Sequence, residues 1–369
     1  MKTRSSAWPL ALLFAALVVY ASLYPFSAWR LQGVAPWAFL TAPLPQYWTG
    51  FDVGANLVGY APLGFLLALA LMRSGSGRWS WPLAVCAPVL LSLGIETLQN
   101  FLPQRVPSNL DFALNSAGAV LGASVAWLLE KLGGLRRWSQ FRADWFEAGA
   151  HGSLVMLALW PAALLYPASV PFGLGQVWDR LEAFLSQLLA DTPFLEWLPR
   201  HAEAATHLGP LAEAFCIALG LLAPLFMGYA DMRSVVRRLG FLFALLFCGL
   251  AAVGLSSALT YGPSHAWSWI GPQSELGLIL ALAMGLAALA LPRRLCAVGL
   301  LLCLAVSLSL LNHALPSPYF AQSLEVWEQG RFIRFHGLSQ WLGWLWPFAA
   351  LVLGVRLVAR APSRPRAAH

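Results

Sequence analysis

Long blocks of apolar residues, separated by short polar segments, run through the whole chain. An apolar block of about 20 residues, rising roughly 1.5 Å per residue, crosses a hydrocarbon layer roughly 30 Å thick. Because the lipid interior offers no partner for backbone N–H and C=O groups, each block is expected to be a helix. The pattern predicts about ten transmembrane helices, at residues 7–25, 54–72, 81–99, 109–129, 151–169, 208–228, 239–259, 275–291, 295–311 and 337–357.

The composition supports this interpretation and excludes a soluble globular protein. Of the 369 residues, 59% are hydrophobic and only 11% are charged. A soluble domain carries about 25% charged residues, which it needs to cover its surface. The chain is therefore expected to be an all-α integral membrane protein.

The formal net charge of +7 suggests a nucleic-acid partner, but the placement of the basic residues argues against one. Of the 23 Lys and Arg residues, 17 lie on the side of the predicted topology that holds both chain ends. The six on the other side are Arg30, Arg105, Arg180, Arg200, Arg331 and Arg334. Cytoplasmic loops carry an excess of Lys and Arg, so both termini are expected in the cytoplasm and no nucleic acid is expected to bind.

Similar short motifs indicate that the chain repeats a four-helix unit. The first predicted helix ends in Ser22-Leu-Tyr-Pro-Phe26 and the fifth in Leu165-Tyr-Pro-Ala168, and an outer segment bearing Trp follows each. We expect a four-helix membrane domain at residues 1–133, a cytoplasmic linker at 134–148, a second, degenerate four-helix unit at 149–292, and a helix pair with a basic tail at 293–369.

Polar residues interrupt the apolar pattern at the ends of the second, third and fourth predicted helices. Spacings of three or four residues put the members from each helix on one helical face. Ser108 is expected to N-cap the fourth helix, with Asp111 three residues further on. The candidate ligand-binding residues are Asp52, Asn56, Tyr60, Glu96, Gln99, Arg105, Ser108, Asp111 and Asn115.

The predicted topology places all these residues at the outer leaflet. A charged side chain in a membrane helix costs about 2.5–3.5 kcal/mol, so the three carboxylates and the single base are expected to face one another in one pocket. Two simpler interpretations remain open. Ser108 and Asp111 would only cap a helix, and Asn56 and Asn115 would only join helices by hydrogen bonds.

The same positions resemble a known family. The motifs are Asn56-x-x-x-Tyr60-x-Pro62-Leu63-Gly64-Phe65, then Ser92-x-x-Ile95-Glu96-x-x-Gln99, then Arg105-x-x-Ser108-x-x-Asp111-x-x-x-Asn115-x-x-Gly118-x-x-x-Gly122. In order and spacing they resemble the VanZ-like family over roughly residues 10–132. The resemblance implies a multi-pass protein of the bacterial cytoplasmic (inner) membrane that acts on or near the cell envelope. The family is named for a factor in glycopeptide resistance, a trait of particular members.

Three functions fit these observations. The first is binding of an envelope lipid or glycolipid headgroup, in cell-envelope or polysaccharide biogenesis or in antibiotic tolerance. Its partners would be membrane lipids, with a lipid-linked envelope precursor as one candidate. The second is an intramembrane enzyme in which Glu96 or Asp111 acts as a general base or binds a divalent cation. The third is a structural partner of envelope-synthesis enzymes.

We favour the first function, because no nucleophile with an adjacent base stands out. His is absent from the first 150 residues, which argues against zinc and against a Ser–His mechanism. The five Cys residues form no CxxC pair, so neither a metal site nor another cofactor is expected. The oligomeric state is left open.

Overall fold

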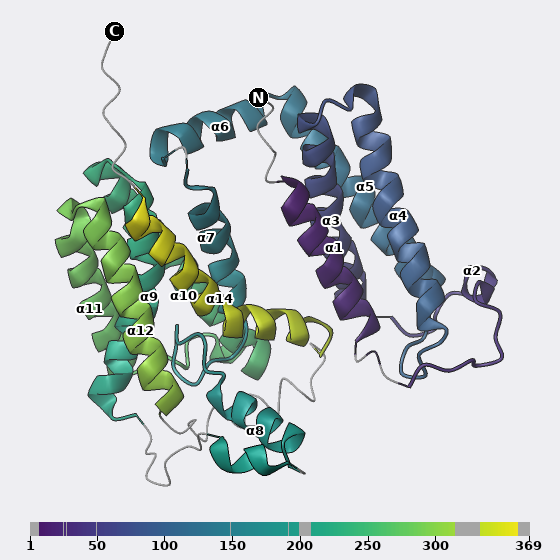
Figure 1. The fold of residues 1–369 in the computed structure, drawn as a ribbon. Coiled ribbons are helices and arrows are strands. Elements are labelled where there is room, and N and C mark those ends of the chain that lie inside the picture. The colour runs from purple at the N-terminus through teal and green to yellow at the C-terminus, as the bar shows by residue number, and fades with distance from the viewer. Residues whose placement is uncertain are drawn as a thin grey trace. The chain divides into compact units, whose positions relative to one another are not determined.

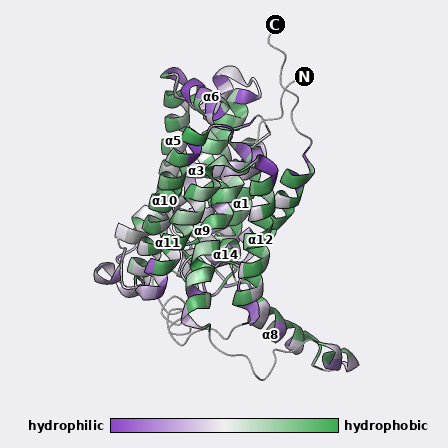
Figure 2. Cartoon of the chain, turned by 90° about the vertical axis from the view of Figure 1, so that its left-hand side faces the viewer, coloured by the Kyte–Doolittle hydropathy of each residue, from purple (hydrophilic) through white to green (hydrophobic). Residues whose placement is uncertain are grey.

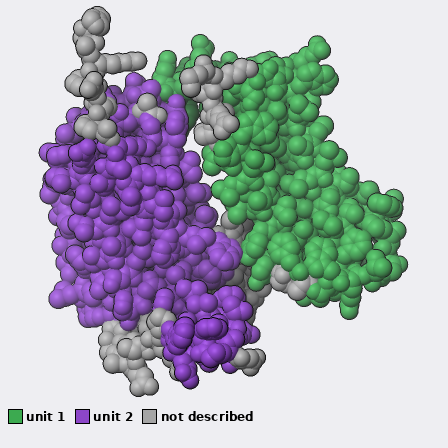
Figure 3. Space-filling model, viewed as in Figure 1, with its two compact units in different colours: residues 1–141 green, residues 142–369 purple. Residues whose placement is uncertain are grey.

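The computed structural model describes residues 7–24, 26, 28–48, 50–147, 149–190, 192–198, 208–313 and 333–360. Within this part of the chain every regular element is a helix. The chain divides into two compact units, Met1–Phe141 and Arg142–His369, which Figure 3 shows in different colours. We call them unit 1 and unit 2.

Unit 1 consists of four long helices and shorter connecting pieces (Figure 1). Its helices are α1 (Ala7–Leu23), α2 (Ala38–Thr41), α3 (Gly50–Arg73), the 3₁₀ helix η1 (Gly77–Trp79), α4 (Ser80–Gln99) and α5 (Asn109–Lys131). Helix α6 (Gly134–Trp145) crosses the boundary between the units and is mostly hydrophilic in Figure 2. It lies in the segment predicted as a linker.

Unit 2 contains the remaining helices. They are α7 (His151–Ala163), α8 (Trp178–Leu188), η2 (Pro193–Trp197), α9 (Pro210–Asp231), α10 (Val235–Tyr261), η3 (Pro263–His265), α11 (Pro272–Ala287), η4 (Ala288–Ala290), α12 (Arg293–His313) and α14 (Ile333–Ala359). Helix α9 lies at the centre, almost wholly buried against α11 and α12. The helix pair predicted at 293–369 packs within this unit, because α12 contacts α9 and α14 contacts α7 and α12. Residues 361–369 of the predicted basic tail lie outside the described residues.

Eight described helices are long and apolar enough to cross a membrane: α3, α4, α5, α9, α10, α11, α12 and α14. The expectation of an all-α, multi-pass membrane protein is therefore confirmed. Helices α1, with 17 residues, and α7, with 13 residues, are apolar but shorter. Each of the ten predicted spans coincides with a helix, although two of these helices fall short of full spanning length.

The predicted span 151–169 is wrong at its end, over residues 164–169, because α7 ends at Ala163. The apolar sequence continues, but Pro167 and Pro171 have no N–H to donate to a helical ladder. The segment 164–177 of unit 2 is instead irregular, and Phe172 within it is buried in a backbone conformation with φ 64°. The prolines, and not a loss of hydropathy, mark the end of this helix.

Glycines let α3 and α5 approach until their backbones touch. A Cβ atom built on Gly122 would lie 1.8 Å from the carbonyl oxygen of Ala61, and one on Gly118 would lie 2.3 Å from that of Leu57. From the facing helix, a Cβ on Gly64 would lie 2.3 Å from the carbonyl oxygen of Ala119. Small residues at membrane helix interfaces allow such contact. The approach brings the polar faces of α3 and α5 together.

Candidate functional site

The polar cluster of unit 1 forms where the first half of α3 meets the end of α4 and the start of α5. Glu96 stands one turn before the end of α4 and is only 3% exposed. One of its carboxylate oxygens, Oε2, accepts a hydrogen bond from the backbone N–H of Ser108 at 2.9 Å. The carboxylate of the third predicted helix is therefore tied to the first residue before the fourth.

Ser108 continues this chain of contacts into α3. Its hydroxyl oxygen accepts a hydrogen bond from the backbone N–H of Asp111 at 3.3 Å, which confirms it as the N-cap of α5. The Oδ1 atom of Asp111 in turn accepts a 2.7 Å hydrogen bond from Nδ2 of Asn56. Ser108 therefore caps α5, as expected. The same residues also link α3, α4 and α5 through their hydrogen bonds.

A second set of polar side chains lies one turn deeper. Nδ2 of Asn115 donates to Oγ of Ser92 at 3.0 Å, and Ser92 is fully buried. The hydroxyl of Tyr60 lies beside Ser92 and Glu96. Neither this hydroxyl nor Oδ1 of Asn115 makes a hydrogen bond of normal geometry to the described residues. Leaving such a buried atom unpartnered costs about 1–3 kcal/mol.

Two predicted site residues, Gln99 and Arg105, donate hydrogen bonds to carbonyl oxygens at the end of α1. Nη2 of Arg105 donates to the carbonyl oxygens of Tyr24 at 2.8 Å and of Ala21 at 3.2 Å. Nε2 of Gln99 donates to the carbonyl oxygen of Ser22 at 3.0 Å. The last carbonyls of a helix lack partners within the helix, so these two side chains satisfy them. Asp52 belongs to the first turn of α3, and its side chain lies outside the described part of the chain.

The structure therefore brings together six of the nine predicted residues. They are Asn56, Tyr60, Glu96, Ser108, Asp111 and Asn115. Ser92 joins them. It belongs to the sequence motif, but a Ser in an apolar helix gives no sign of the side chain that it contacts.

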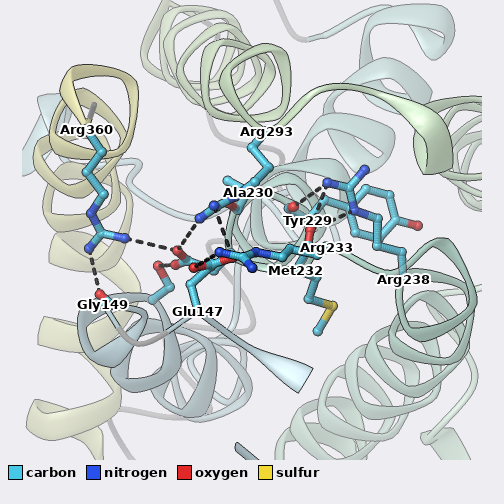
Figure 4. A network of polar contacts seen from close by, with 11 residues as sticks. Glu147, Gly149, Tyr229, Ala230, Met232, Arg233, Arg238, Arg293 and Arg360 are labelled. Atoms are coloured by element: carbon cyan, nitrogen blue, oxygen red, sulfur yellow. Dashed lines mark hydrogen bonds and ion pairs between the residues drawn. The ribbon is translucent and has the colours of Figure 1, made fainter. Parts of the chain in front are cut away.

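Unit 2 contains an ion-pair network that the sequence analysis missed (Figure 4). Asp231, the last residue of α9, is fully buried and accepts a hydrogen bond from the hydroxyl of Ser153. Its Oδ1 atom also lies 3.0 Å from Nη1 of Arg360 and 3.7 Å from Nη2 of Arg293. The buried carboxylate thus joins α7, α9, α12 and the end of α14.

Glu147 extends this network at the same end of α9. Its carboxylate pairs with Arg233 and lies 3.2 Å from Nη1 of Arg293. Its backbone N–H also donates to the carbonyl oxygen of Asp231 at 2.9 Å. The sequence signal was present, since both acids adjoin segments rich in Arg, but counting basic residues by side does not reveal which acids they meet.

Arg238 closes the other side of the α9 terminus. The side chain is 4% exposed and donates to four carbonyl oxygens. The acceptors, with donor–acceptor distances, are Tyr229 (2.8 Å), Met232 (3.0 Å), Leu289 (2.9 Å) and Leu291 (2.7 Å). The described hydrogen bonds of Arg238 all go to backbone carbonyl oxygens near helix ends, so this side chain holds those helix ends together.

Comparison with known proteins gives one match. Residues 5–130 match the model of the VanZ/LLP1 family, a range that contains all three sequence motifs. No curated protein and no solved structure shows a significant match. The similarity that the motifs indicated is confirmed, and the N-terminal part of this multi-pass membrane protein carries a VanZ-like domain.

Proposed function

We propose that unit 1 binds the polar headgroup of an envelope lipid or glycolipid in the cluster around Glu96, at the outer side of a bacterial cytoplasmic membrane. The observation that carries the proposal is the incomplete hydrogen bonding of this cluster. Tyr60 and Asn115 are 4% and 5% exposed, yet each keeps one polar atom without a partner among the described residues. A headgroup that reaches these atoms would relieve their desolvation.

The available groups suit hydroxyls better than phosphate. The Ser108 and Asp111 backbone N–H groups, which would attract an anion at the start of α5, already donate to Glu96 and Ser108. Arg105 donates to the end of α1. The side-chain oxygen of Asn115 is available as an acceptor, and the Tyr60 hydroxyl as a donor. A sugar or glycerol headgroup offers the matching alternation of donors and acceptors.

The proposed setting is cell-envelope or polysaccharide biogenesis, or antibiotic tolerance. The lipid would be a membrane lipid or a lipid-linked envelope precursor. Support comes from the VanZ-like domain together with the burial of the cluster. Charged groups inside a membrane protein are expensive and commonly belong to sites where substrates or ions bind.

Tyr60→Phe tests the proposal, because it removes only the unpartnered hydroxyl. The full-length protein would be placed in phosphatidylcholine nanodiscs with a rising fraction of glucosyl diacylglycerol, and its thermal unfolding midpoint measured. We expect the glycolipid to raise the midpoint of the unsubstituted protein. Without glycolipid, the variant should unfold at the same midpoint as the unsubstituted protein. To reach the same rise in midpoint it should need at least about fivefold more glycolipid, a factor that corresponds to the loss of one hydrogen bond.

Tyr229→Phe is the matched control in unit 2. The Tyr229 hydroxyl is also buried but donates to the carbonyl oxygen of Gly285 at 3.2 Å. This variant should lose about 1 kcal/mol of stability in every lipid and keep the glycolipid response. An identical glycolipid response in Tyr60→Phe and the unsubstituted protein would overturn the proposal.

A further inference from the structure

The irregular segment 164–177 of unit 2 lies among the helices instead of on their surface. Tyr166 and Phe172 are 5% and 2% exposed. The Phe172 ring stacks on Trp160 at 6.4 Å and meets the Trp269 ring edge-on at 5.7 Å. Non-helical backbone at membrane depth is tolerated where protein buries it or where it lines a cavity. Residues 164–177 meet both conditions, since several of their side chains are buried by protein and the segment also lines a cavity.

The cavity beside this segment has a volume of about 410 Å³. Its other walls are the first turn of α9, the end of α10 and the residues before α11. By the predicted topology, these helix ends belong to the outer side. The volume suits a small polar molecule or one lipid headgroup.

The hydroxyl groups on the α10 wall present acceptors to the cavity. Their protons are already used: Ser256 donates to the Leu165 carbonyl at 2.9 Å, and Thr260 to the Ser256 carbonyl at 2.8 Å. Ser257 likewise donates to the carbonyl oxygen of His265 at 2.8 Å. The hydroxyl oxygen of Ser256 keeps lone pairs that can accept hydrogen bonds, so this wall favours a ligand that carries hydrogen-bond donors.

Glu213 is the one charged side chain among the described residues that line the cavity. Its carboxylate has no hydrogen-bond or ion-pair partner in the described part of the chain. Tyr166, Phe172 and Trp269 contribute aromatic surface to the lining of the same cavity. A carboxylate with aromatic rings and lone pairs around it is suited to a cation, through ion pairing and cation–π attraction.

Trp269 adds a second requirement. Its indole N–H is buried and has no acceptor among the described residues. An N–H donor beside a cation site calls for a ligand that also carries an oxygen acceptor. We propose that this cavity binds an amino-alcohol head, with its ammonium group on Glu213 and its oxygen on Trp269.

The head could be that of a free small amine or that of an aminophospholipid, and the chemistry is the same for both. The test would use the purified full-length protein. Ethanolamine in detergent solution probes the free amine. Nanodiscs of phosphatidylethanolamine, compared with nanodiscs of phosphatidylglycerol, probe the lipid head. Ethylene glycol, which has the oxygen but no ammonium group, is the neutral control ligand.

Glu213→Gln should weaken binding of the amine at least tenfold while the unfolding midpoint of the ligand-free protein stays unchanged. Glu275→Gln is its matched control, because Glu275 also lies in the first turn of a spanning helix but is exposed and outside the cavity. It should bind as the unsubstituted protein does. Trp269→Phe should weaken ethanolamine about fivefold and leave ethylamine unaffected.

Binding of free ethanolamine that depends on Glu213 would support the site and identify a soluble amine as its source. Stabilisation confined to phosphatidylethanolamine, again dependent on Glu213, would support the site with a lipid source. Equal binding by Glu213→Gln, or equal binding of ethylene glycol, would overturn the proposal. So would the absence of any response to both amine sources. None of these outcomes bears on the cluster of unit 1, whose test uses a neutral glycolipid.

Discussion

Glu96 in unit 1 and Asp231 in unit 2 are both buried carboxylates near the end of a membrane helix, but their surroundings differ. Asp231 meets the hydroxyl of Ser153 and the guanidinium groups of Arg293 and Arg360. Each of its oxygens has a partner, and the partners come from three other helices or their ends. A buried carboxylate with such partners holds helices together.

The cluster around Glu96 is incomplete. Among the described residues, the Tyr60 hydroxyl and Oδ1 of Asn115 are buried without partners, whereas no atom of the Asp231 network is in that state. Burial of a charged side chain therefore does not by itself distinguish a candidate binding site from a contact that only holds helices together. The informative difference is whether the surrounding polar atoms have all found partners, because each orphaned atom keeps about 1–3 kcal/mol available to a ligand or water.

The largest expected effect concerns the sides of the membrane. If Glu96 lies at the outer end and Asp231 at the inner end, then α8 is outside and α6 inside. In a variant without the native cysteines, an impermeant maleimide should label Gln187→Cys in intact cells. It should label Arg137→Cys only after the membrane is opened, since basic segments stay in the cytoplasm. Both side chains are exposed in the structure. The reverse pattern would place the cluster on the cytoplasmic side.

The next effect concerns the approach of α3 to α5, on which the Asn56–Asp111 contact depends. Gly122→Ala places a methyl group 1.8 Å from the Ala61 carbonyl oxygen, and two backbones cannot move apart locally. We expect a loss of about 3 kcal/mol or more in unfolding free energy, measured by denaturant titration in mild detergent. Gly59→Ala in α3 meets nothing within 4 Å and should leave stability unchanged or slightly raised. Equal stability of the two variants would refute the close contact.

The smallest of the three effects concerns the saturated network. Asp231→Asn leaves two guanidinium groups without their shared carboxylate. The cost should be about 2–3 kcal/mol, below that of a fully buried pair, because Arg293 and Arg360 are 32% and 38% exposed. Asp144→Asn, an exposed position in α6, should change stability by less than about 0.5 kcal/mol. Thermal unfolding of both variants decides this. A stable Asp231→Asn protein with impaired function would make the network a site and remove the contrast with Glu96.

The candidate cluster could be predicted in outline, because polar residues in apolar helices are rare and spacing shows which of them share a face. Asn56, Glu96 and Asp111 were placed together correctly on this basis. Gln99 and Arg105 also donate to carbonyl oxygens at the end of α1, contacts that the spacing did not predict. Sequence spacing cannot show which free carbonyls lie within reach of a long side chain.

The sequence by itself determined the class of this protein: an all-helical chain with many helices long and apolar enough to span a membrane. Those properties follow from the cost of exposing backbone polar groups and charges to lipid, a cost that each segment bears alone. Tertiary structure alone decided that segment 164–177 lines a cavity. It also decided that both oxygens of Asp231 have partners, while the Tyr60 hydroxyl has none among the described residues. These outcomes depend on which side chains from distant parts of the sequence come into contact. Such contacts are set by how the helices pack, not by any single segment.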